Sequence, residues 1–325
     1  MTDAPLTTAS GRRVLVTGAS GFVGSHVVRQ LVGDGAHVVA LSSSVSQRTP
    51  ERLADVIADI EIVDANICDP SSLTHAVAVA RPDLVIHLAA FTHVGRSFYR
   101  VDENIQTNVQ GTVNLLQALD GRFERFVYIG SGDVYGDGQA PFREDQPVAP
   151  VSPYAVSKYA AERFCRMFHQ AYSWPIVCLR PFNAYGPWQS VDRVVPELVV
   201  AGLQGKPLQM TEGRQTREFT FVEDVANAFV LALVTPGIDG EVLNVGSGEE
   251  VSMRTLALTV LELLGNPVEP EFGALPYRPT EIWRMVGDSS RAERLLGWRA
   301  TRSLPDGLAR TVDWYKQRLA EGALR

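Results

Sequence analysis

The feature that most constrains the fold is a run of three glycines near the N-terminus, in the segment VLVTGASGFVG. Gly18, Gly21 and Gly24 follow an apolar, strand-like stretch (13–17) and open a stretch with helical spacing (22–32). Such a loop must turn tightly and let its backbone approach a pyrophosphate, and side chains would obstruct both. The helix behind it offers unpaired N–H groups to the phosphates. The segment therefore predicts a dinucleotide cradle made of Gly18, Ser20, Gly21, Phe22, Val23 and Gly24.

Short apolar runs alternate with longer amphipathic ones as far as residue 182. Strands are expected at 13–17, 37–41, 60–63, 84–88, 125–130 and 176–180, and long helices at 101–119 and 152–172. Strands this apolar must be covered on both faces, so the alternation predicts a doubly wound parallel α/β sheet of the Rossmann type. The looser pattern beyond residue 183 predicts a smaller α/β substrate lobe (183–325). Part of it, residues 215–250, is expected to return to the first domain (1–182).

Composition excludes several classes of protein. The 325 residues carry a formal net charge of −7 with no run of lysines or arginines, which argues against nucleic acid as a partner. No apolar stretch approaches the roughly 20 residues that span a bilayer, and no membrane association is expected. Cys68, Cys165 and Cys178 lack metal-ligand spacing, so no metal site is predicted. The N-terminus lacks the apolar core of a signal peptide, which favours a cytoplasmic location.

The end of the second predicted strand bears on the choice of cofactor. A carboxylate about 20 residues beyond the glycines normally binds the ribose hydroxyls of NAD. Here Leu41 is followed by Ser42, Ser43 and Ser44, with Arg48 nearby. This pattern favours NADP(H), whose 2′-phosphate an acid would repel, and leaves NAD(H) possible.

A proton-transfer pair lies further along the chain. Tyr154 and Lys158 are four residues apart in a predicted helix and so share one face. A tyrosine is a poor base at neutral pH because its reference pKa is about 10. A neighbouring ammonium would stabilise the phenolate and make tyrosine usable as an acid or base. Ser131 follows a predicted strand at its carboxyl end, where ligands bind in such sheets.

The order of these motifs along the chain resembles that of a known enzyme family. The segments TGASGFVG, HLAAFTHVGRS, TNVQGTVNLL, GSGDVYG, SPYAVSK, RPFNAYGP and TREFTFVEDVANA resemble those of extended short-chain dehydrogenases/reductases that modify nucleotide sugars. The resemblance implies a catalytic set of Ser131, Tyr154 and Lys158, with Asp133 as a further candidate. It implies cofactor contacts from Asn66, Ile67, Leu88, Ala89, Ala90, Asn108 and Pro181. The residues implied for a nucleotide-diphosphate hexose are Thr92, Asn183, Arg193, Val195, Arg217, Arg278 and Glu281, and His93 lies in a stretch that resembles the sugar pocket.

The resemblance also implies a homodimer, in which the helices at 101–119 and 152–172 pair with their mates. Phe164, Met167 and Phe168 are candidate apolar contacts there. Their packing into this chain's own core is an equally good interpretation.

The reaction is narrowed by what the site lacks. The segment RPTEIWRMVGDSSRAERLLGW resembles the tail of GDP-mannose 4,6-dehydratases and of the matching keto-sugar reductases. Related dehydratases carry a threonine in place of Ser131 and a glutamate in place of Asp133, and Gly132 offers no acid. The leading hypothesis is therefore NADPH-dependent reduction of a GDP- or dTDP-linked 4-keto-6-deoxyhexose. The alternatives are an NAD-dependent 4-epimerase or 4,6-dehydratase, a non-catalytic cofactor-binding regulator, and a structural protein.

Overall fold

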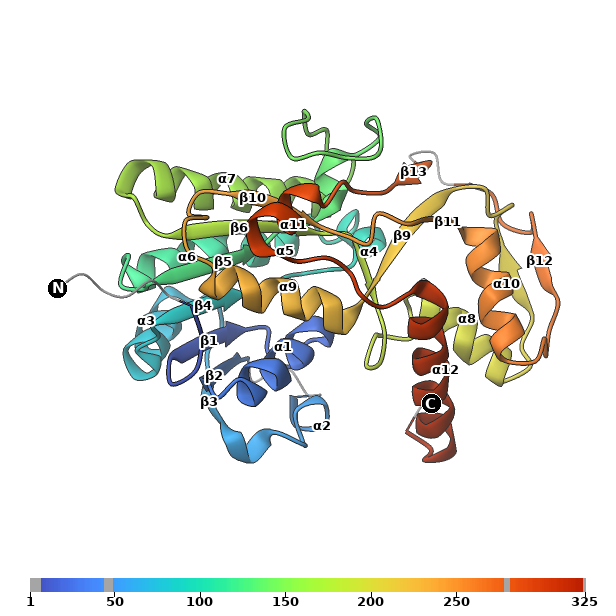
Figure 1. Ribbon diagram of the computed structural model, residues 1–325, viewed down its shortest axis with the longest axis horizontal. Helices are drawn as coiled ribbons and strands as arrows, with labels where there is room; N and C mark the ends of the chain where they lie inside the picture. Colours follow the sequence, from blue (N-terminus) through green and yellow to red (C-terminus); the bar gives the residue numbers. More distant parts are fainter. Residues whose placement is uncertain (1–6, 44–48, 278–280, 324–325) are drawn as a thin grey trace.

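The computed structural model describes residues 7–43, 49–277 and 281–323. Its centre is a parallel sheet, as predicted, and the sheet has seven strands (Figure 1). In spatial order the strands are β10 (Val242–Val245), β6 (Ile176–Pro181), β5 (Arg125–Ile129), β4 (Leu84–His87), β1 (Arg13–Thr17), β2 (His37–Ser42) and β3 (Ile60–Asp64). The strand order reverses between β1 and β4, which brings the carboxyl ends of both strands to one crevice.

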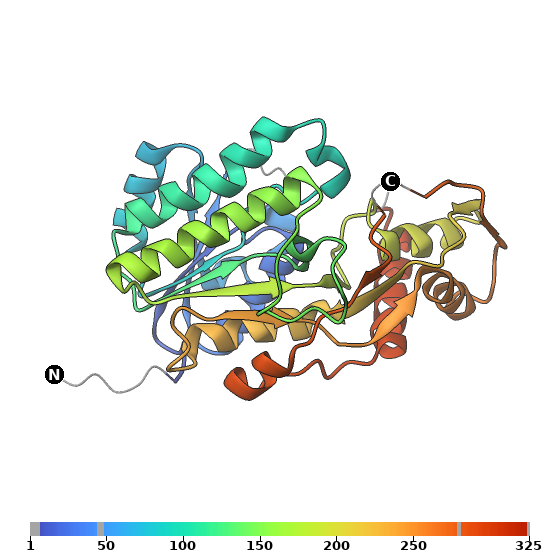
Figure 2. The same cartoon turned by 90° about the horizontal axis from the view of Figure 1, so that it is seen from above.

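Helices cover both faces of this sheet (Figure 2). One face carries α1 (Phe22–Gly33), α9 (Val222–Val234) and α11 (Ser290–Leu296), and the other carries α3 (Pro70–Ala80), α6 (Gly111–Leu119) and α7 (Pro153–Tyr172). Side chains of β1 alternate between the two layers: Val14 and Val16 pack on α1 and α9, and Leu15 packs on the opposite side. Both layers are apolar, which is why the strands read as continuous hydrophobic runs.

Capping residues determine where α7 and α3 begin. The side chain of Ser152 accepts a hydrogen bond from the Ala155 N–H at the start of α7, and Pro153 takes the first helical position. Asp69 and Pro70 open α3 in the same way. The capping of α7 places Tyr154 in the first turn, at the end of the helix that faces the crevice.

The segment predicted as one helix over 101–119 has a more complex course. It begins as α5 (Val101–Asn104), widens into a π-helical turn (Ile105–Gln110) and continues as α6. Apolar periodicity does not report such an insertion, because the helix keeps its direction and its buried face. Short turns elsewhere are α2 (Thr49–Arg52), α4 (Val94–Ser97) and 3₁₀ turns at Ile57–Asp59 and Gly132–Tyr135.

A smaller group of elements lies beyond the crevice at one end of the molecule (Figure 1). A second sheet contains β7 (Asn183–Tyr185), β9 (Thr216–Phe221), β11 (Glu250–Ser252) and β13 (Arg284–Met285), and β8 (Leu208–Met210) pairs with β12 (Pro270–Phe272). Helices α8 (Val194–Leu203), α10 (Met253–Leu263) and α12 (Leu304–Ala320) pack around a core of their own. The chain returns to the large sheet through α9, β10 and α11. The division at residue 182 stays a prediction.

In the described part of the chain, no helix is both long and apolar enough to span a membrane. Nor do three His, Cys, Asp or Glu side chains among these residues gather closely enough to share a metal ion.

Candidate active site

The glycine loop between β1 and α1 has no room for side chains. Gly18 has a φ of +69°, and a Cβ there would lie 2.7 Å from the backbone nitrogen of Ala89. A Cβ on Gly24 would lie 2.1 Å from the carbonyl oxygen of Gly18. The first turn of α1 has no side-chain cap, because its N-cap is Gly21. These features suit the pyrophosphate of a dinucleotide, which the free N–H groups of the helix would bind.

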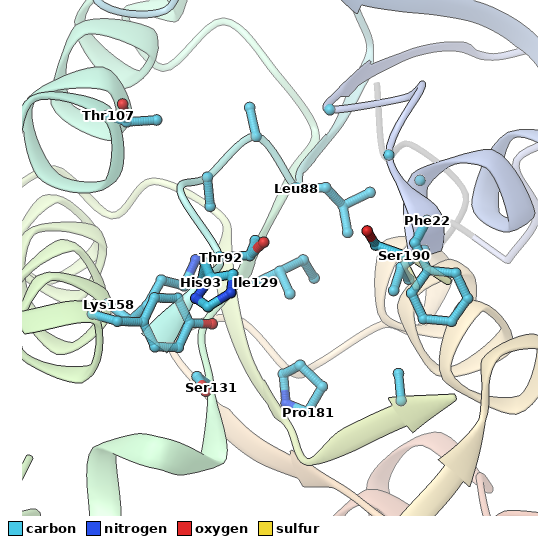
Figure 3. Close-up of a pocket in the computed structure, with 18 of the residues that line it drawn as sticks. Phe22, Leu88, Thr92, His93, Thr107, Ile129, Ser131, Lys158, Pro181 and Ser190 are labelled. Carbon is cyan, nitrogen blue, oxygen red and sulfur yellow. The ribbon is translucent and has the colours of Figure 1, made fainter. Parts of the chain in front are cut away.

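The loop opens into a cleft of about 1120 Å³ at the carboxyl ends of the parallel strands. Figure 3 shows Ser131 and Lys158 at one end of this cleft and Phe22 with Ser190 at the other. Most of the predicted site residues line it: Gly18, Ser20, Gly21, Phe22, Val23, Gly24, Ser42, Ser43, Asn66, Ile67, Leu88, Ala89, Ala90, Thr92, His93, Ser131, Asp133, Tyr154, Lys158, Pro181, Asn183, Arg193 and Val195. A cleft of this volume and lining could hold a dinucleotide beside a second ligand.

Ser131, Tyr154 and Lys158 are brought together at the buried end of the cleft. All three are less than a tenth exposed. The Ser131 hydroxyl donates to Asp133 Oδ2 at 3.0 Å and is also within hydrogen-bonding reach of the Tyr154 phenol. Lys158 Nζ lies 4.7 Å from the centre of the Tyr128 ring, which stabilises the ammonium. A hydroxyl or carbonyl bound against Ser131 and Tyr154 could therefore exchange a proton with the phenol.

The electrostatics of the phenol differ from the sequence-based expectation. Burial raises the pKa of Tyr154 to about 12, and the carboxylate of Asp133 contributes to that rise. Burial also lowers the pKa of Lys158 to about 8. The protein's own groups thus leave the tyrosine a weaker acid than in water, because desolvation and the Asp133 charge outweigh the opposing effects of the Ser131 hydrogen bond and of Arg193.

The position between Ser131 and Asp133 is closed by an aromatic ring. A Cβ on Gly132 would lie 2.8 Å from two carbon atoms of the Phe182 ring. Phe182 is 7% exposed and stacks on Tyr135, with ring centres 6.3 Å apart. No side chain fits at residue 132 unless Phe182 moves. Asp133 itself lines the cleft, and burial raises the pKa of its carboxyl while Arg217 and Arg193 oppose that rise.

The structure brings only some of the residues predicted to bind the sugar nucleotide into the cleft. Arg193 precedes α8 and donates to the carbonyl oxygen of Thr92 at 3.1 Å, which bridges the two sides of the cleft. The amide of Asn183 donates to the Glu218 carbonyl oxygen at 3.0 Å.

Arg217, one of the two arginines predicted to bind the substrate diphosphate, lies outside the cleft lining. Arg217 forms an ion pair with Glu281 at 2.7 Å, and neither residue is among the described residues that line the cleft. Arg278 lies outside the described residues, as do Ser44 and Arg48.

Asn108 is the one predicted cofactor residue that the structure places behind the cleft. It lies in the π-helical turn, 1% exposed, and its side chain bonds the backbone of Phe91 and the hydroxyl of Ser157. It therefore orders the loop after β4 and the helix of Tyr154, and among described residues the cleft lining does not include it.

A carboxylate does line the cleft beside Ser42, but β3 supplies it and β2 does not. Asp64 ends β3, pairs in register with Ser42 of β2, and lines the cleft with Arg52. Arg52 donates to the carbonyl oxygen of Ser20 at 3.2 Å. The sequence contained a signal for this carboxylate, because Asp64 directly follows the apolar run at 60–63. Gln189, Ser190 and Asp192 also line the cleft, and they stand in no pattern that the sequence marks.

The fold and site define a class: a nucleotide-binding α/β enzyme with a buried serine–tyrosine–lysine set. Residues 14–246 match the NAD dependent epimerase/dehydratase family, and the chain belongs to that family. It is 38% identical over 317 residues to a UDP-glucose 4-epimerase of Mycolicibacterium smegmatis, covering 94% of this chain and 99% of the relative. It is 34% identical over 334 residues to a dTDP-glucose 4,6-dehydratase of Neisseria meningitidis serogroup B, covering 94% and 93%. The structure of DesIV, a dTDP-glucose 4,6-dehydratase from Streptomyces venezuelae with NAD bound, superposes with a TM-score of 0.87 at 33% identity, covering 95% of this chain and 98% of that one.

Proposed function

We propose that this chain is an NAD-dependent enzyme that inverts the 4-hydroxyl of a nucleotide-linked hexose. The observation that carries the choice is the packing of Phe182 against Gly132. Loss of the 6-hydroxyl in a dehydration needs an acid beside the substrate, but residue 132 is a glycine and the Phe182 ring, as it is packed, leaves no room for a side chain there. Inversion at C4 needs only proton exchange at the 4-oxygen and a hydride carrier, and the Ser131–Tyr154–Lys158 set is complete.

The proposed reaction assigns a task to each of these residues. Ser131 holds the 4-oxygen of the sugar. The Tyr154 oxygen takes the proton of the 4-hydroxyl, and it returns this proton after the 4-keto-sugar has rotated to present its opposite face. Lys158, with its pKa lowered to about 8, is still mostly protonated at neutral pH and holds the ribose next to the phenol. Bound NAD⁺ would accept and return the hydride and add a positive charge beside Tyr154, which favours the phenolate.

NAD is favoured over NADP in this proposal. The carboxylate of Asp64 lies beside Ser42 at the end of the sheet where the adenosine ribose would bind. A carboxylate suits the ribose hydroxyls of NAD and repels a 2′-phosphate. The NAD in the DesIV structure agrees with this choice, and the sequence-based preference for NADP has no such support. Titration of the purified protein with NAD⁺ and NADP⁺ tests it: tighter binding of NADP⁺ would overturn it.

The test of the reaction uses a panel of intact UDP-, dTDP- and GDP-hexoses with catalytic NAD⁺. Epimerisation gives the C4 epimer of the substrate with no net change in NADH absorbance. Tyr154→Phe is the matched control, since it removes only the phenolic oxygen. A 4-keto-6-deoxy product, or no conversion of any hexose, would contradict the proposal.

A 4,6-dehydratase is the second candidate, and Asp133 is the observation that favours it. Its carboxyl lines the cleft beside Ser131, and burial raises its pKa, so that it could exchange a proton with a sugar carbon. Dehydration removes the C5 proton, so a reaction in D₂O would leave carbon-bound deuterium at C5 of the product, whereas inversion at C4 would leave no carbon-bound deuterium.

Reduction of a 4-keto-6-deoxyhexose with NADPH, the leading hypothesis from the sequence, is less favoured. The relatives described above are epimerases and dehydratases, and Asp64 counts against a 2′-phosphate. Stoichiometric oxidation of NADPH with a nucleotide-4-keto-6-deoxy sugar would restore it.

A homodimer and a cytoplasmic location complete the proposal. An apolar groove of about 680 Å³ runs between the α5–π segment and the start of α7, and Val101, Ile105 and Val156 on it are 41–52% exposed. Of the apolar contacts expected on α7, Phe164 and Met167 are also exposed, whereas Phe168 packs on the chain's own core. A second copy of α5 and α7 would cover this face. Light scattering should give a dimer mass for the wild type and a monomer mass for Val156→Glu.

The three cysteines are free thiols, which suits a reducing compartment.

A further inference from the structure

A buried histidine lies between the glycine loop and the helix of Tyr154, and the proposed reaction does not use it. His87 ends β4 and is 1% exposed. Its Nδ1 lies 2.7 Å from Thr17 Oγ1, and its Nε2 lies 2.9 Å from Thr112 Oγ1. Thr17 directly precedes Gly18, and Thr112 lies on α6. The imidazole thus joins the strand that carries the cofactor loop to a helix of the opposite layer.

The outer hydrogen bonds fix the direction of the inner ones. The Thr112 hydroxyl donates to the Asn108 carbonyl oxygen at 2.7 Å, so its oxygen must accept a proton from His87 Nε2. The backbone N–H of Ala89 donates to Thr17 Oγ1 at 3.1 Å, which leaves the Thr17 hydroxyl to donate to His87 Nδ1. The ring is neutral, since burial and the charge of Lys158 lower the pKa of His87 to about 3. Each donor then has one acceptor, in a single direction.

The same series of bonds continues to the catalytic tyrosine. The Asn108 side chain holds both the N–H and the carbonyl of Phe91, at 2.7 and 3.1 Å, and donates to Ser157 Oγ at 2.8 Å. The Ser157 hydroxyl donates in turn to the carbonyl oxygen of Tyr154 at 2.8 Å. Buried networks in which every member is satisfied are rigid and specify one arrangement. This one spans the distance between the two functional ends of the cleft.

We propose that His87, with its proton on Nε2, is a positioning residue that fixes the glycine loop relative to the helix of Tyr154. It would thereby set where the cofactor lies against the phenol. Within the described chain, Thr17, His87 and Thr112 are not among the residues that line the cleft, so their influence on a bound cofactor must pass through the network. The inference rests on the cofactor site of the proposed function and is independent of which sugar reaction follows.

A double-mutant cycle with NAD⁺ as the probe tests this coupling. Thr17→Val and Thr112→Val each remove one hydroxyl with little change of shape, and the two hydroxyls bond opposite nitrogens of the His87 ring. Each variant should weaken NAD⁺ binding about 5-fold to 10-fold, the effect of one buried hydrogen bond. The double variant should be weakened by much less than the product of the two, because either change alone breaks the series. In a His87→Phe background the two effects should become simply multiplicative.

Thr311→Val is the matched control. Thr311 is fully buried on α12 and donates to the Gly307 carbonyl oxygen at 2.7 Å, the same local bond that Thr112 makes. Among the described residues, no hydrogen bond joins it to His87, so loss of its hydroxyl should lower the free energy of unfolding and leave NAD⁺ affinity unchanged. This separates a change of position from a general loss of stability.

The second measurement reads the ring directly. In protein labelled with ¹⁵N-histidine, the signals absent from His87→Phe should show one protonated and one unprotonated ring nitrogen, with the proton on Nε2. Multiplicative effects of the two threonine variants in the wild-type background would overturn the proposal. So would a proton on Nδ1 or a charged ring. If the wild-type protein binds no NAD⁺, the proposed cofactor fails, and the ring-nitrogen measurement still decides the inference.

Discussion

Substitution of Gly132 by alanine tests the packing on which the choice of reaction depends. The backbone at residue 132 suits any residue, so the added methyl group is the only change. It would lie 2.8 Å from two atoms of the Phe182 ring and 3.0 Å from a third. Carbon atoms prefer separations of about 3.5–4.0 Å, so the ring must retreat by roughly 0.7 Å. Phe182 cannot do so freely, because its other side faces Gly287, where a Cβ would lie 2.3 Å from the ring.

The expected cost follows from this geometry. Overpacking of a closed site costs about 1–3 kcal/mol, so Gly132→Ala should lower the free energy of unfolding by that amount. Phe182→Ala should cost about 3–5 kcal/mol because it empties a buried site. In the double variant the methyl group added at residue 132 occupies part of the space that the ring has left. The cost of the double variant should therefore fall short of the sum by at least about 1 kcal/mol.

Urea denaturation of the four proteins measures these differences. Gly33→Ala is the control, since a Cβ at that helical position meets nothing within 4 Å. It should be neutral or stabilise by up to about 1 kcal/mol. Additive costs at residues 132 and 182, or a Gly132→Ala protein as stable as the wild type, would refute the argument that Phe182 excludes an acid from this position.

Three further outcomes are expected. Tyr154→Phe should lower kcat by at least about 10²-fold and leave NAD⁺ affinity within a few-fold, as measured by turnover and titration; preserved turnover would contradict the role of the phenol. Glu162→Gln breaks a fully buried pair with Arg180 (2.7 and 2.9 Å) and should cost about 3–5 kcal/mol in urea denaturation, whereas a loss below about 1 kcal/mol would contradict the burial of this charge. The pKa of His87 is lowered from 6.5 to about 3. Between these two pH values the ring is therefore protonated in the unfolded chain and neutral in the folded protein. Stability is thus fully present above pH 6.5 and falls on acidification, by up to about 1.4 kcal/mol per pH unit; His87→Phe should show a shallower loss between pH 6.5 and 5 in denaturation curves.

Features set by neighbouring residues were predictable from the sequence. The glycine loop, the buried strands and the start of α7 each depend on a few adjacent residues whose conformational limits are strong. Tyr154 and Lys158 share a helix face because they are four residues apart. Ser131 could be placed because the carboxyl ends of parallel strands meet at one edge. In each case a local rule and the sheet topology lead to the same answer.

Features set by residues far apart in the chain were not predictable. Phe182 closes the space at Gly132 across about 50 residues of sequence, and no spacing rule records which ring fills which gap. Asp64 was overlooked because the strand beside β2, and not β2 itself, supplies the acid. The raised pKa of Tyr154 depends on burial and on Asp133, which the helix spacing to Lys158 does not show. The pairing of Arg217 with Glu281 is likewise a product of the lobe's assembly.

The outermost strand of the large sheet has a consequence for how the chain reaches its native state. β10 pairs with β6, although 60 residues separate the two strands in sequence. A nascent chain ending near residue 182 would present β6 as an open edge, with unpaired backbone groups able to recruit a strand from another chain. To fold during synthesis without associating with another chain, the protein therefore needs residues 242–245 to be synthesised soon after β6. For the same reason, we expect a fragment ending at residue 182 to associate rather than fold, so the nucleotide-binding half should not be separable by truncation there.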